Sequence, residues 1–312
     1  MERSLSESAS ALLALSNDLA EAVARAGQTV VAVYGRPRMP SSGVHWRPGV
    51  VVTAEHTLKR DEDLSVGLPD GRTAPAVLAG RDPSTDLAVL KLQGEEFPTA
   101  GIGDAAALRV GHMVLAVARP GERGRGLSAS WGVISALGGP WRTWHGGQIE
   151  QFIRLDLTLY PGFSGGPLVD AHGRVVGINT SGPRSMALTI PRLTVDRVVD
   201  QLLEKGRIVH GYLGLGMQPV RLPESLERSL NLPRTGGVII VAVEPDSPAE
   251  RAGLLIGDIL IALEGVTVSD TADVQALLGP ERVGTTVGAS IIRAGQLLER
   301  AITVGERPRR GR

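Results

Sequence analysis

One serine lies in a glycine-rich segment that could expose it for chemistry. Residues 161–170 read PGFSGGPLVD, so Ser164 stands between glycines on both sides. The G-F-S-G-G stretch formally matches the G-x-S-x-G turn at which α/β-hydrolases present a nucleophilic serine. That turn requires a helix directly after the serine, whereas Gly165, Gly166 and Pro167 break helices. We therefore reject the esterase interpretation and ask which other serine chemistry fits.

A serine hydroxyl becomes a nucleophile when a histidine takes its proton and an acid orients that histidine. His56 ends the strand-like run VVVTAEH, and Asp86 opens the run DLAVLKL. The order His56, Asp86, Ser164 is that of chymotrypsin. Each residue alone is typical of a turn, a cap or a solvated strand end. Together, at strand edges, they predict a catalytic triad. The backbone N–H groups of Gly162 and Ser164 are then expected to face a developing oxyanion.

The composition excludes several other kinds of protein. The 312 residues carry zero formal net charge, which disfavours nucleic-acid binding as the main function. The chain has no Cys, so thiolate catalysis and Cys-based zinc sites are excluded, and the motifs call for no metal or cofactor. No apolar run reaches the roughly 18 residues of a membrane span. The first 27 residues lack the basic start of an export signal, so we expect a cytoplasmic location.

Short strands must hold such a triad. The 40 Gly and 20 Pro, with Val-rich runs near residues 29–95 and 110–190, favour two packed antiparallel barrels over a helical bundle. Apolar residues recur with helical spacing before the first barrel, so we expect a helix packed on the body there. They are Leu12, Leu15, Leu19 and Val23. A second helical pattern ends at Gly206 and marks a domain boundary.

Several motifs resemble the HtrA (Deg-type) serine proteases. They are TAEH around His56, DPSTDLAVLKL around Asp86, and PGFSGGPLVDAHGRVVGINT around Ser164. GYLGLGMQPV and GVIIVAVEPDSPAERAGLLIGDILIALEGVTV resemble that family's PDZ domain. The resemblance implies a mainly β fold, in which a chymotrypsin-like double β-barrel precedes a small α+β PDZ domain. The expected segments are an N-terminal helical segment, a trypsin-like serine protease domain, a PDZ domain and a basic, disordered tail, at residues 1–27, 28–206, 211–305 and 306–312.

The resemblance also implies a role for each site residue. Ser164 would be the nucleophile, His56 the general base and then the general acid, and Asp86 the group that orients His56. Gly162 and Ser164 would supply the oxyanion N–H groups. An extended substrate would pair with a strand at three consecutive residues, Asn179, Thr180 and Ser181.

The C-terminal unit carries its own candidate binding site. Four consecutive residues resemble the family's carboxylate-binding loop, Tyr212, Leu213, Gly214 and Leu215. Successive N–H groups in such a loop form a nest for a peptide's C-terminal carboxylate. Val274 and Leu277, on a helix further along, either line the pocket for the peptide's side chain or belong to the core. The pattern supports both interpretations equally.

One position departs from the family's pattern. Phe163 stands directly before Ser164, where this family usually has Asn and trypsin-like relatives have Asp. A polar side chain there can help to fix the oxyanion turn, whereas Phe can only pack.

The resemblance implies an ATP-independent serine endopeptidase that cleaves unfolded or damaged proteins in protein quality control and the stress response. Its expected partners are unfolded polypeptides, C-terminal peptides at the PDZ domain, and two further copies of itself in a homotrimer. The family's usual location, the cell envelope, is the alternative to the cytoplasm. The alternative function is a catalytically silent, protease-like scaffold or holdase that binds peptides through its PDZ domain, with the oxyanion turn distorted by Phe163.

Overall fold

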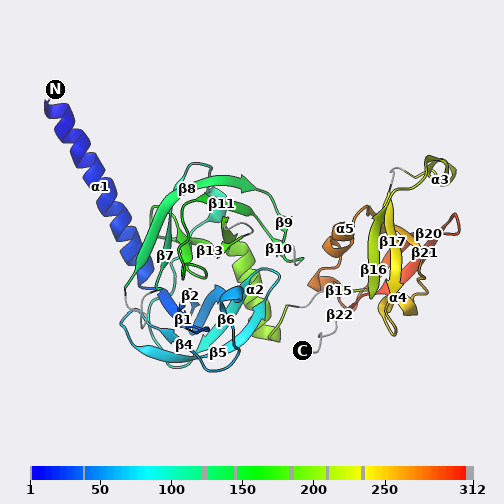
Figure 1. Cartoon of the computed structure of the whole chain (residues 1–312), viewed down its shortest axis with the longest axis horizontal. Coiled ribbons are helices and arrows are strands. Elements are labelled where there is room, and N and C mark those ends of the chain that lie inside the picture. Colours follow the sequence, from blue (N-terminus) through cyan, green and yellow to red (C-terminus); the bar gives the residue numbers. More distant parts are fainter. Residues whose placement is uncertain are drawn as a thin grey trace. The chain divides into compact units, whose positions relative to one another are not determined.

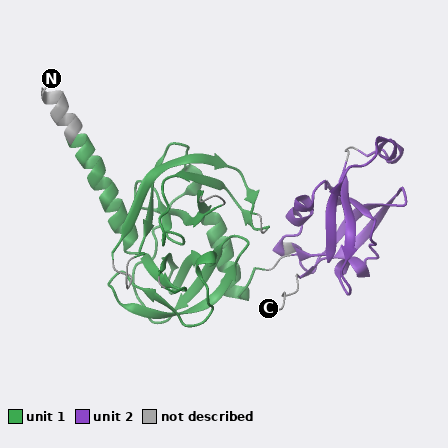
Figure 2. Cartoon of the chain, in the orientation of Figure 1, with its two compact units in different colours: residues 1–208 green, residues 209–312 purple. Residues whose placement is uncertain are grey.

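The chain folds into two compact units, residues 1–208 and 209–312, coloured separately in Figure 2. The computed structural model describes residues 2–37, 39–120, 126–143, 146–182, 186–208, 211–232 and 236–306. The expected basic tail lies outside the described residues after Glu306. Each unit has its own hydrophobic core and is described by itself.

The first barrel closes from six antiparallel strands in the order β1-β2-β3-β6-β5-β4 (Figure 1). Their bounds are β1 Val30–Tyr34, β2 Ser41–Arg47, β3 Val50–Ala54, β4 Leu64–Gly67, β5 Thr73–Asp82 and β6 Leu87–Leu92. Successive side chains of a strand point to opposite faces. Val51 accordingly packs inside this barrel, whereas Val50 and Val52 join a core that includes strands of the second barrel. Burial on both faces explains why β3 is apolar without alternation.

The second barrel has the order β11-β14-β13-β12-β7-β8, so both predicted barrels are confirmed. Its strands are β7 Met113–Ala118, β8 Ser128–Gly138, β11 Phe152–Asp156, β12 Pro167–Val169, β13 Val175–Ser181 and β14 Ala187–Pro191. A small hairpin, β9 Trp141–Arg142 with β10 Gln148–Ile149, lies between β8 and β11 in the chain. Leu115, Val169 and Ile178 contribute to the same core as Val50 and Val52, which joins the two barrels into one body.

Two longer helices belong to the first unit. Helix α2, Arg192–Lys205, buries Val195, Val198 and Leu202 against the barrels and ends at Gly206, which adopts φ +69°. Helix α1, Glu2–Gly27, packs only through its last turns, where Ala22 and Ala26 are buried.

The expected packing of α1 along its whole apolar stripe is therefore wrong for its first half. Leu12 and Leu15 are 69% and 39% exposed, and the described part of α1 before Leu19 extends away from the strands in Figure 1. No helix among the described residues is long and apolar enough to cross a membrane.

The second unit is a small sheet with short helices. Its strands are β16 Leu215–Val220, β17 Gly237–Val243, β18 Ile259–Leu263, β19 Val266–Thr267, β20 Thr286–Arg293 and β21 Gln296–Thr303, and β15 Gly211–Tyr212 pairs with β22 Gly305–Glu306. Its helices are α3 Glu224–Leu230, α4 Pro248–Arg251 and α5 Thr271–Ala276. Side-chain N-caps fix where two of these helices begin, α4 and α5. Ser247 caps α4 before Pro248, and Asp270 forms a reciprocal capping box with Asp273 at the start of α5.

Candidate active site

His56 and Asp86 are delivered by neighbouring strands of the first barrel. Buried β3 ends at Ala54, and a single 3₁₀ turn, Glu55–Thr57, then places the His56 side chain at the barrel edge, 43% exposed. Asp86 directly precedes β6, which pairs with β3. Asp86 adopts φ +59°, a left-handed conformation that is uncommon outside glycine and tends to occur at functional positions.

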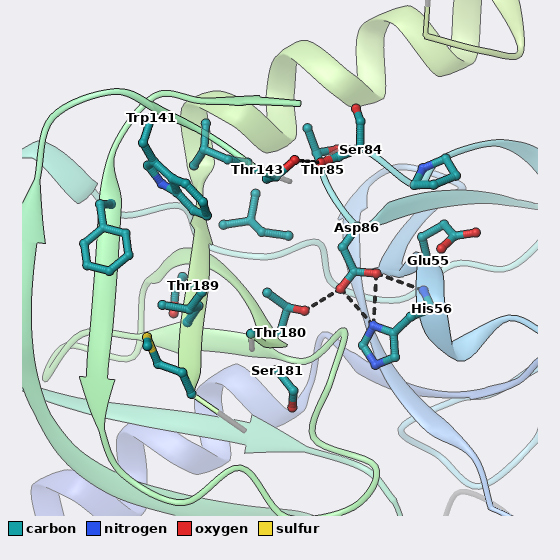
Figure 3. A pocket seen from close by; sticks show the side chains of 17 residues that line it. Glu55, His56, Ser84, Thr85, Asp86, Trp141, Thr143, Thr180, Ser181 and Thr189 are labelled. Carbon is teal, nitrogen blue, oxygen red and sulfur yellow. Dashed lines mark hydrogen bonds and ion pairs between the residues drawn. The ribbon is translucent and has the colours of Figure 1, made fainter. Parts of the chain in front are cut away.

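The Asp86 carboxylate receives hydrogen bonds from both sides. His56 Nδ1 lies 2.9 Å from Oδ1 and 2.8 Å from Oδ2, and the His56 backbone N–H donates to Oδ1 over 2.8 Å. The Thr180 hydroxyl, from β13 of the second barrel, donates to Oδ2. Figure 3 shows Asp86 between these two partners. The carboxylate therefore holds the imidazole with Nδ1 as the protonated nitrogen, which leaves Nε2 as the proton acceptor.

Ser164 lies in a turn that is fixed by backbone contacts. The Ser42 N–H donates to the Ser164 carbonyl over 3.2 Å, and the Gly165 N–H donates to the Asn179 carbonyl over 2.9 Å. Gly165 has φ +86°, and a Cβ there would lie 2.2 Å from the Ser42 carbonyl oxygen, so only glycine fits. Among the described residues, no hydrogen bond joins the Ser164 hydroxyl to His56. Such bonds are often long in ligand-free enzymes.

Two hollows flank these side chains. One, of about 470 Å³, is lined by His56, Asp86 and Thr180 together with apolar side chains that include Trp141. The other, of about 480 Å³, is lined by Leu159, Tyr160, Pro161, Gly162, Ser164 and Ser181, among others. Ser181 lines both hollows, so it lies where they approach each other. His56 and Asp86 thus line one hollow and Ser164 the other, and Ser181 is common to both.

The three residues expected to pair with substrate have different positions. The Asn179 N–H and carbonyl are already bonded to Gly166 and Gly165, and its buried side chain donates to the Pro167 carbonyl. Asn179 thus supports the Ser164 turn. Thr180 binds Asp86, a role that the sequence reading did not assign to it. Ser181, at the end of β13, is the exposed member of the trio.

The predicted PDZ loop leads from β15 into β16. Its backbone carbonyls at Leu213 and Gly214 accept the N–H groups of Ala249 and Glu244 over 2.9 and 2.8 Å. Gly214 has φ +80°, and a Cβ there would collide with the Ser247 side chain at 2.2 Å. The first residue of the loop, Tyr212, donates its hydroxyl to Glu244, whereas the last, Leu215, pairs with Val243.

The two helix residues proposed for the PDZ pocket lie against the core. Val274 is fully buried, and Leu277 is partly buried and packs on the same cluster. Val274 belongs to the same buried cluster as the strand residues Val238 and Ile240, as its core interpretation predicts. A role for Val274 or Leu277 in the peptide pocket stays a prediction.

Residues 41–178 match the trypsin-like peptidase domain family, and residues 211–304 match the PDZ domain family. A protein of Chlamydia trachomatis named a probable periplasmic serine endoprotease DegP-like is 34% identical over 266 residues, which is 83% of this chain and 52% of that protein. A protein of Brucella suis with the same name is 35% identical over 284 residues, 88% of this chain and 54% of that protein. The chain spans about half the length of these curated relatives.

Solved structures match most of the chain, across both units. The HtrA-type protease AlgW with a decapeptide has a TM-score of 0.76 and 31% identity, over 93% of this chain and 99% of that one. The serine endoprotease from Yersinia pestis has a TM-score of 0.75 and 30% identity, over 93% of this chain and 98% of that one.

The expected cytoplasmic location is wrong. Relatives from three genera, Chlamydia, Halomonas and Brucella, are named probable periplasmic serine endoproteases, which points to the cell envelope. The expectation depended on the failure to find an export signal, and a feature that is not found in a sequence does not fix a compartment.

The two domain families, the two closed barrels and the solved structures agree with one another and with the motifs around the predicted triad. The chain therefore belongs to the HtrA (Deg-type) serine proteases and carries a single matched PDZ domain after its protease domain.

Proposed function

We propose that this chain is an ATP-independent serine endopeptidase that cleaves unfolded polypeptides. One observation carries the proposal: the Asp86 carboxylate binds His56 Nδ1 at 2.8–2.9 Å while the Thr180 hydroxyl holds it from the other barrel. This arrangement fixes the tautomer in which His56 Nε2 can accept a proton. A silent scaffold that binds peptides through its PDZ domain would not require this set of hydrogen bonds around Asp86.

In the proposed reaction, the Ser164 hydroxyl oxygen attacks the carbonyl carbon of the substrate and its proton passes to His56 Nε2. Asp86 stabilises the resulting imidazolium. The N–H groups of Gly162 and Ser164 bind the oxyanion of the tetrahedral intermediate. His56 then protonates the leaving amine as the C–N bond breaks, and a water molecule hydrolyses the acyl-enzyme by the reverse route.

The proposed substrate class follows from the strand end beside the triad, at Ser181 of β13. Backbone pairing with the end of β13 at Ser181 recognises an extended chain without regard to most side chains, and folded proteins rarely offer such a chain. The adjacent 470 Å³ hollow, lined by Trp141, Phe152 and Met186, would take an apolar side chain of the same substrate. Unfolded proteins supply both features, which supports a function in protein quality control.

The PDZ unit is proposed to bind peptide C-termini at the loop Tyr212 to Leu215, with the peptide added as a strand beside β16. Fluorescence anisotropy with a labelled peptide tests this. An amidated copy of the same peptide should bind at least about tenfold more weakly, because the N–H groups of the loop lose the carboxylate. Equal binding of the two peptides would contradict the proposal.

A homotrimer is proposed from the family's usual assembly. Leu12 and Leu15 of α1 supply exposed apolar surface on the described part of the first unit, which is compatible with contact between copies. Sedimentation equilibrium of the full chain measures the mass directly, and a monomer at micromolar concentration would contradict this part of the proposal.

The alternative, a silent scaffold, was motivated by Phe163. Its side chain is buried at 2% exposure and packs with Ala116 and Ala118, and the Phe163 N–H donates to the Tyr160 carbonyl over 3.0 Å, which supports an ordered turn. The decisive assay compares degradation of fluorescent casein by the wild-type chain and by Ser164→Ala, without ATP. We expect the variant to lose about 10⁴- to 10⁶-fold in kcat. Equal rates, or a wild-type chain that a fluorophosphonate does not label, would favour the scaffold.

A further inference from the structure

The geometry points to Ser42 as the positioning residue of the oxyanion turn, with Arg119 fixing Ser42 in place. This inference rests on the proposed function, because it concerns the turn that would present the Gly162 N–H to substrate. Ser42 lies on β2 of the first barrel, and Gly162 lies 120 positions later, in the second barrel. Neither Ser42 nor Arg119 is assigned a catalytic or binding role by the motifs around the triad.

The turn itself has one defined geometry. The Phe163 N–H donates to the Tyr160 carbonyl over 3.0 Å, with Pro161 and Gly162 between them. Gly162 has φ +90°. Proline at the second position and a positive φ at the third are typical of a type II turn. A type I turn differs by reversal of the central peptide, here Pro161–Gly162, which carries the candidate oxyanion N–H. The turn type thus determines whether that N–H is available to substrate.

One buried hydroxyl holds the carbonyl side of this turn. Ser42 Oγ donates to the Gly162 carbonyl over 2.8 Å and accepts the Arg119 backbone N–H over 2.9 Å. The Ser42 N–H also donates to the Ser164 carbonyl. Because a peptide group is planar, the Gly162–Phe163 peptide is held at its oxygen by Ser42 and at its N–H by Tyr160. The fixed Gly162–Phe163 peptide therefore restricts how the preceding Pro161–Gly162 peptide, which carries the Gly162 N–H, can rotate.

Arg119 connects Ser42 to the end of α1 and the start of β1. The residue is 6% exposed, and its guanidinium donates to the Val30 carbonyl over 2.7 Å and to the Gly27 carbonyl over 2.8 Å. These carbonyls lie at the end of α1 and the start of β1. Arg119 is therefore fixed by two backbone carbonyls outside the turn, and its backbone N–H meets the Ser42 hydroxyl in a defined position. Burial lowers the pKa of this guanidinium, and the two short hydrogen bonds offset part of its desolvation.

Phe163 explains why a separate hydrogen bond is needed. Its ring packs with Ala116, Ala118 and the partly buried Leu157, and it meets the Tyr160 ring edge-on at 5.7 Å between centroids. These contacts fix where the ring lies but supply no hydrogen bond to the turn. A carboxylate or amide at position 163 could form a hydrogen bond that fixes the turn. In this chain the Ser42 hydroxyl supplies that hydrogen bond instead.

The test compares Ser42→Ala with Ser41→Ala in the full chain. Ser41 is the neighbouring residue, equally buried, and donates to Thr57 Oγ1 rather than to the turn. With an alanine-ending fluorogenic peptide, Ser42→Ala should lower kcat by about 10- to 100-fold with KM changed less than about threefold. The affinity for a peptide boronate, which forms a tetrahedral adduct at Ser164, should fall by the same factor. Ser41→Ala should leave both within about twofold of wild type.

Further measurements separate positioning from general damage. The NMR titration of His56 should be the same in Ser42→Ala and wild type, because the His56–Asp86 contact is untouched. Ser42→Cys, which keeps a weaker donor, should give an intermediate kcat. Wild-type kcat in Ser42→Ala, with Ser164→Ala inactive, would overturn the inference and leave the proposed function standing. An equal loss in Ser41→Ala would also overturn it. Activity that persists in Ser164→Ala would instead overturn the proposed function.

Discussion

The first barrel presents His56 and Asp86 through charged and polar hydrogen bonds at an exposed edge, whereas the second barrel presents Gly162 and Ser164 through a turn held by backbone contacts, apolar packing and the buried Ser42 hydroxyl. The first arrangement depends on a charged pair, so it is sensitive to single changes of charge. The second depends mainly on the shape of its buried surroundings, so it is sensitive to added volume, to cavities and to loss of the Ser42 hydroxyl. The two halves of the site should therefore fail in different ways.

The largest effect is expected from Asp86→Asn, which tests the charged half. The amide keeps the size of the side chain but cannot stabilise an imidazolium and permits the wrong tautomer of His56. We expect kcat to fall about 10⁴-fold while thermal stability changes little. Steady-state kinetics with the fluorogenic peptide measures this. A loss below tenfold would show that Asp86 does not orient the base.

Gly162→Ala tests the shape-dependent half. The new Cβ would lie 2.4 Å from Pro120 Cβ, at a φ of +90° that alanine rarely adopts. The turn must shift, and loss of one oxyanion donor lowers kcat about 10²- to 10³-fold. Gly111→Ala is the matched control, since Gly111 has φ +91° but no atom within 4 Å of the added Cβ. If both variants lost the same activity, backbone strain alone would explain the result.

Phe163→Ala should separate stability from chemistry in the same turn. Removing a buried ring leaves a cavity beside Ala116 and Ala118, so the free energy of unfolding of the protease unit should fall by about 3 kcal/mol. Urea denaturation followed by tryptophan fluorescence measures the change. The fall in kcat should be smaller than in Gly162→Ala, because the Ser42 hydrogen bond to the turn remains. A larger fall would mean that the ring, rather than Ser42, positions the turn.

The smallest effect concerns a histidine outside the site. His45 Nδ1 lies 3.0 Å from the Pro98 carbonyl, and Nε2 accepts the Gly49 N–H over 3.1 Å, which requires the neutral ring. Burial lowers the pKa of His45 below its ordinary value near 6.5. The unfolded chain therefore binds the proton more readily.

Stability should consequently decrease as the pH falls from about 6.5 towards the folded-state pKa of His45, with a slope of at most about 1.4 kcal/mol per pH unit. His45→Gln should flatten this part of the stability profile while leaving the pH profile of kcat, which reports His56, in place. If the variant shifted the pH profile of kcat, the two histidines would be coupled. His45 would then belong to the charged half of the site rather than to the surrounding barrel.

Much of this architecture follows from local signals in the sequence. The order His56, Asp86, Ser164 and the helix-breaking residues after Ser164 exclude one serine chemistry and indicate another. Short Val-rich runs, separated by Gly and Pro, predict two barrels, because they require only that each strand bury one or both faces. Motifs of this kind depend on neighbours within a few residues, which a sequence displays directly.

Only the tertiary structure decided which partner each polar group found. Asn179 was expected to face substrate, yet it holds the Ser164 turn, and Thr180 binds Asp86 from 94 positions away. The contact between Ser42 and Gly162 spans 120 positions and exists because two barrels close against each other. Phe163 alone suggested a distorted turn, whereas the folded chain surrounds it with small apolar side chains and provides the missing hydrogen bond elsewhere. A run of apolar residues indicates a buried strand, but closure of the whole fold determines which polar groups become hydrogen-bond partners.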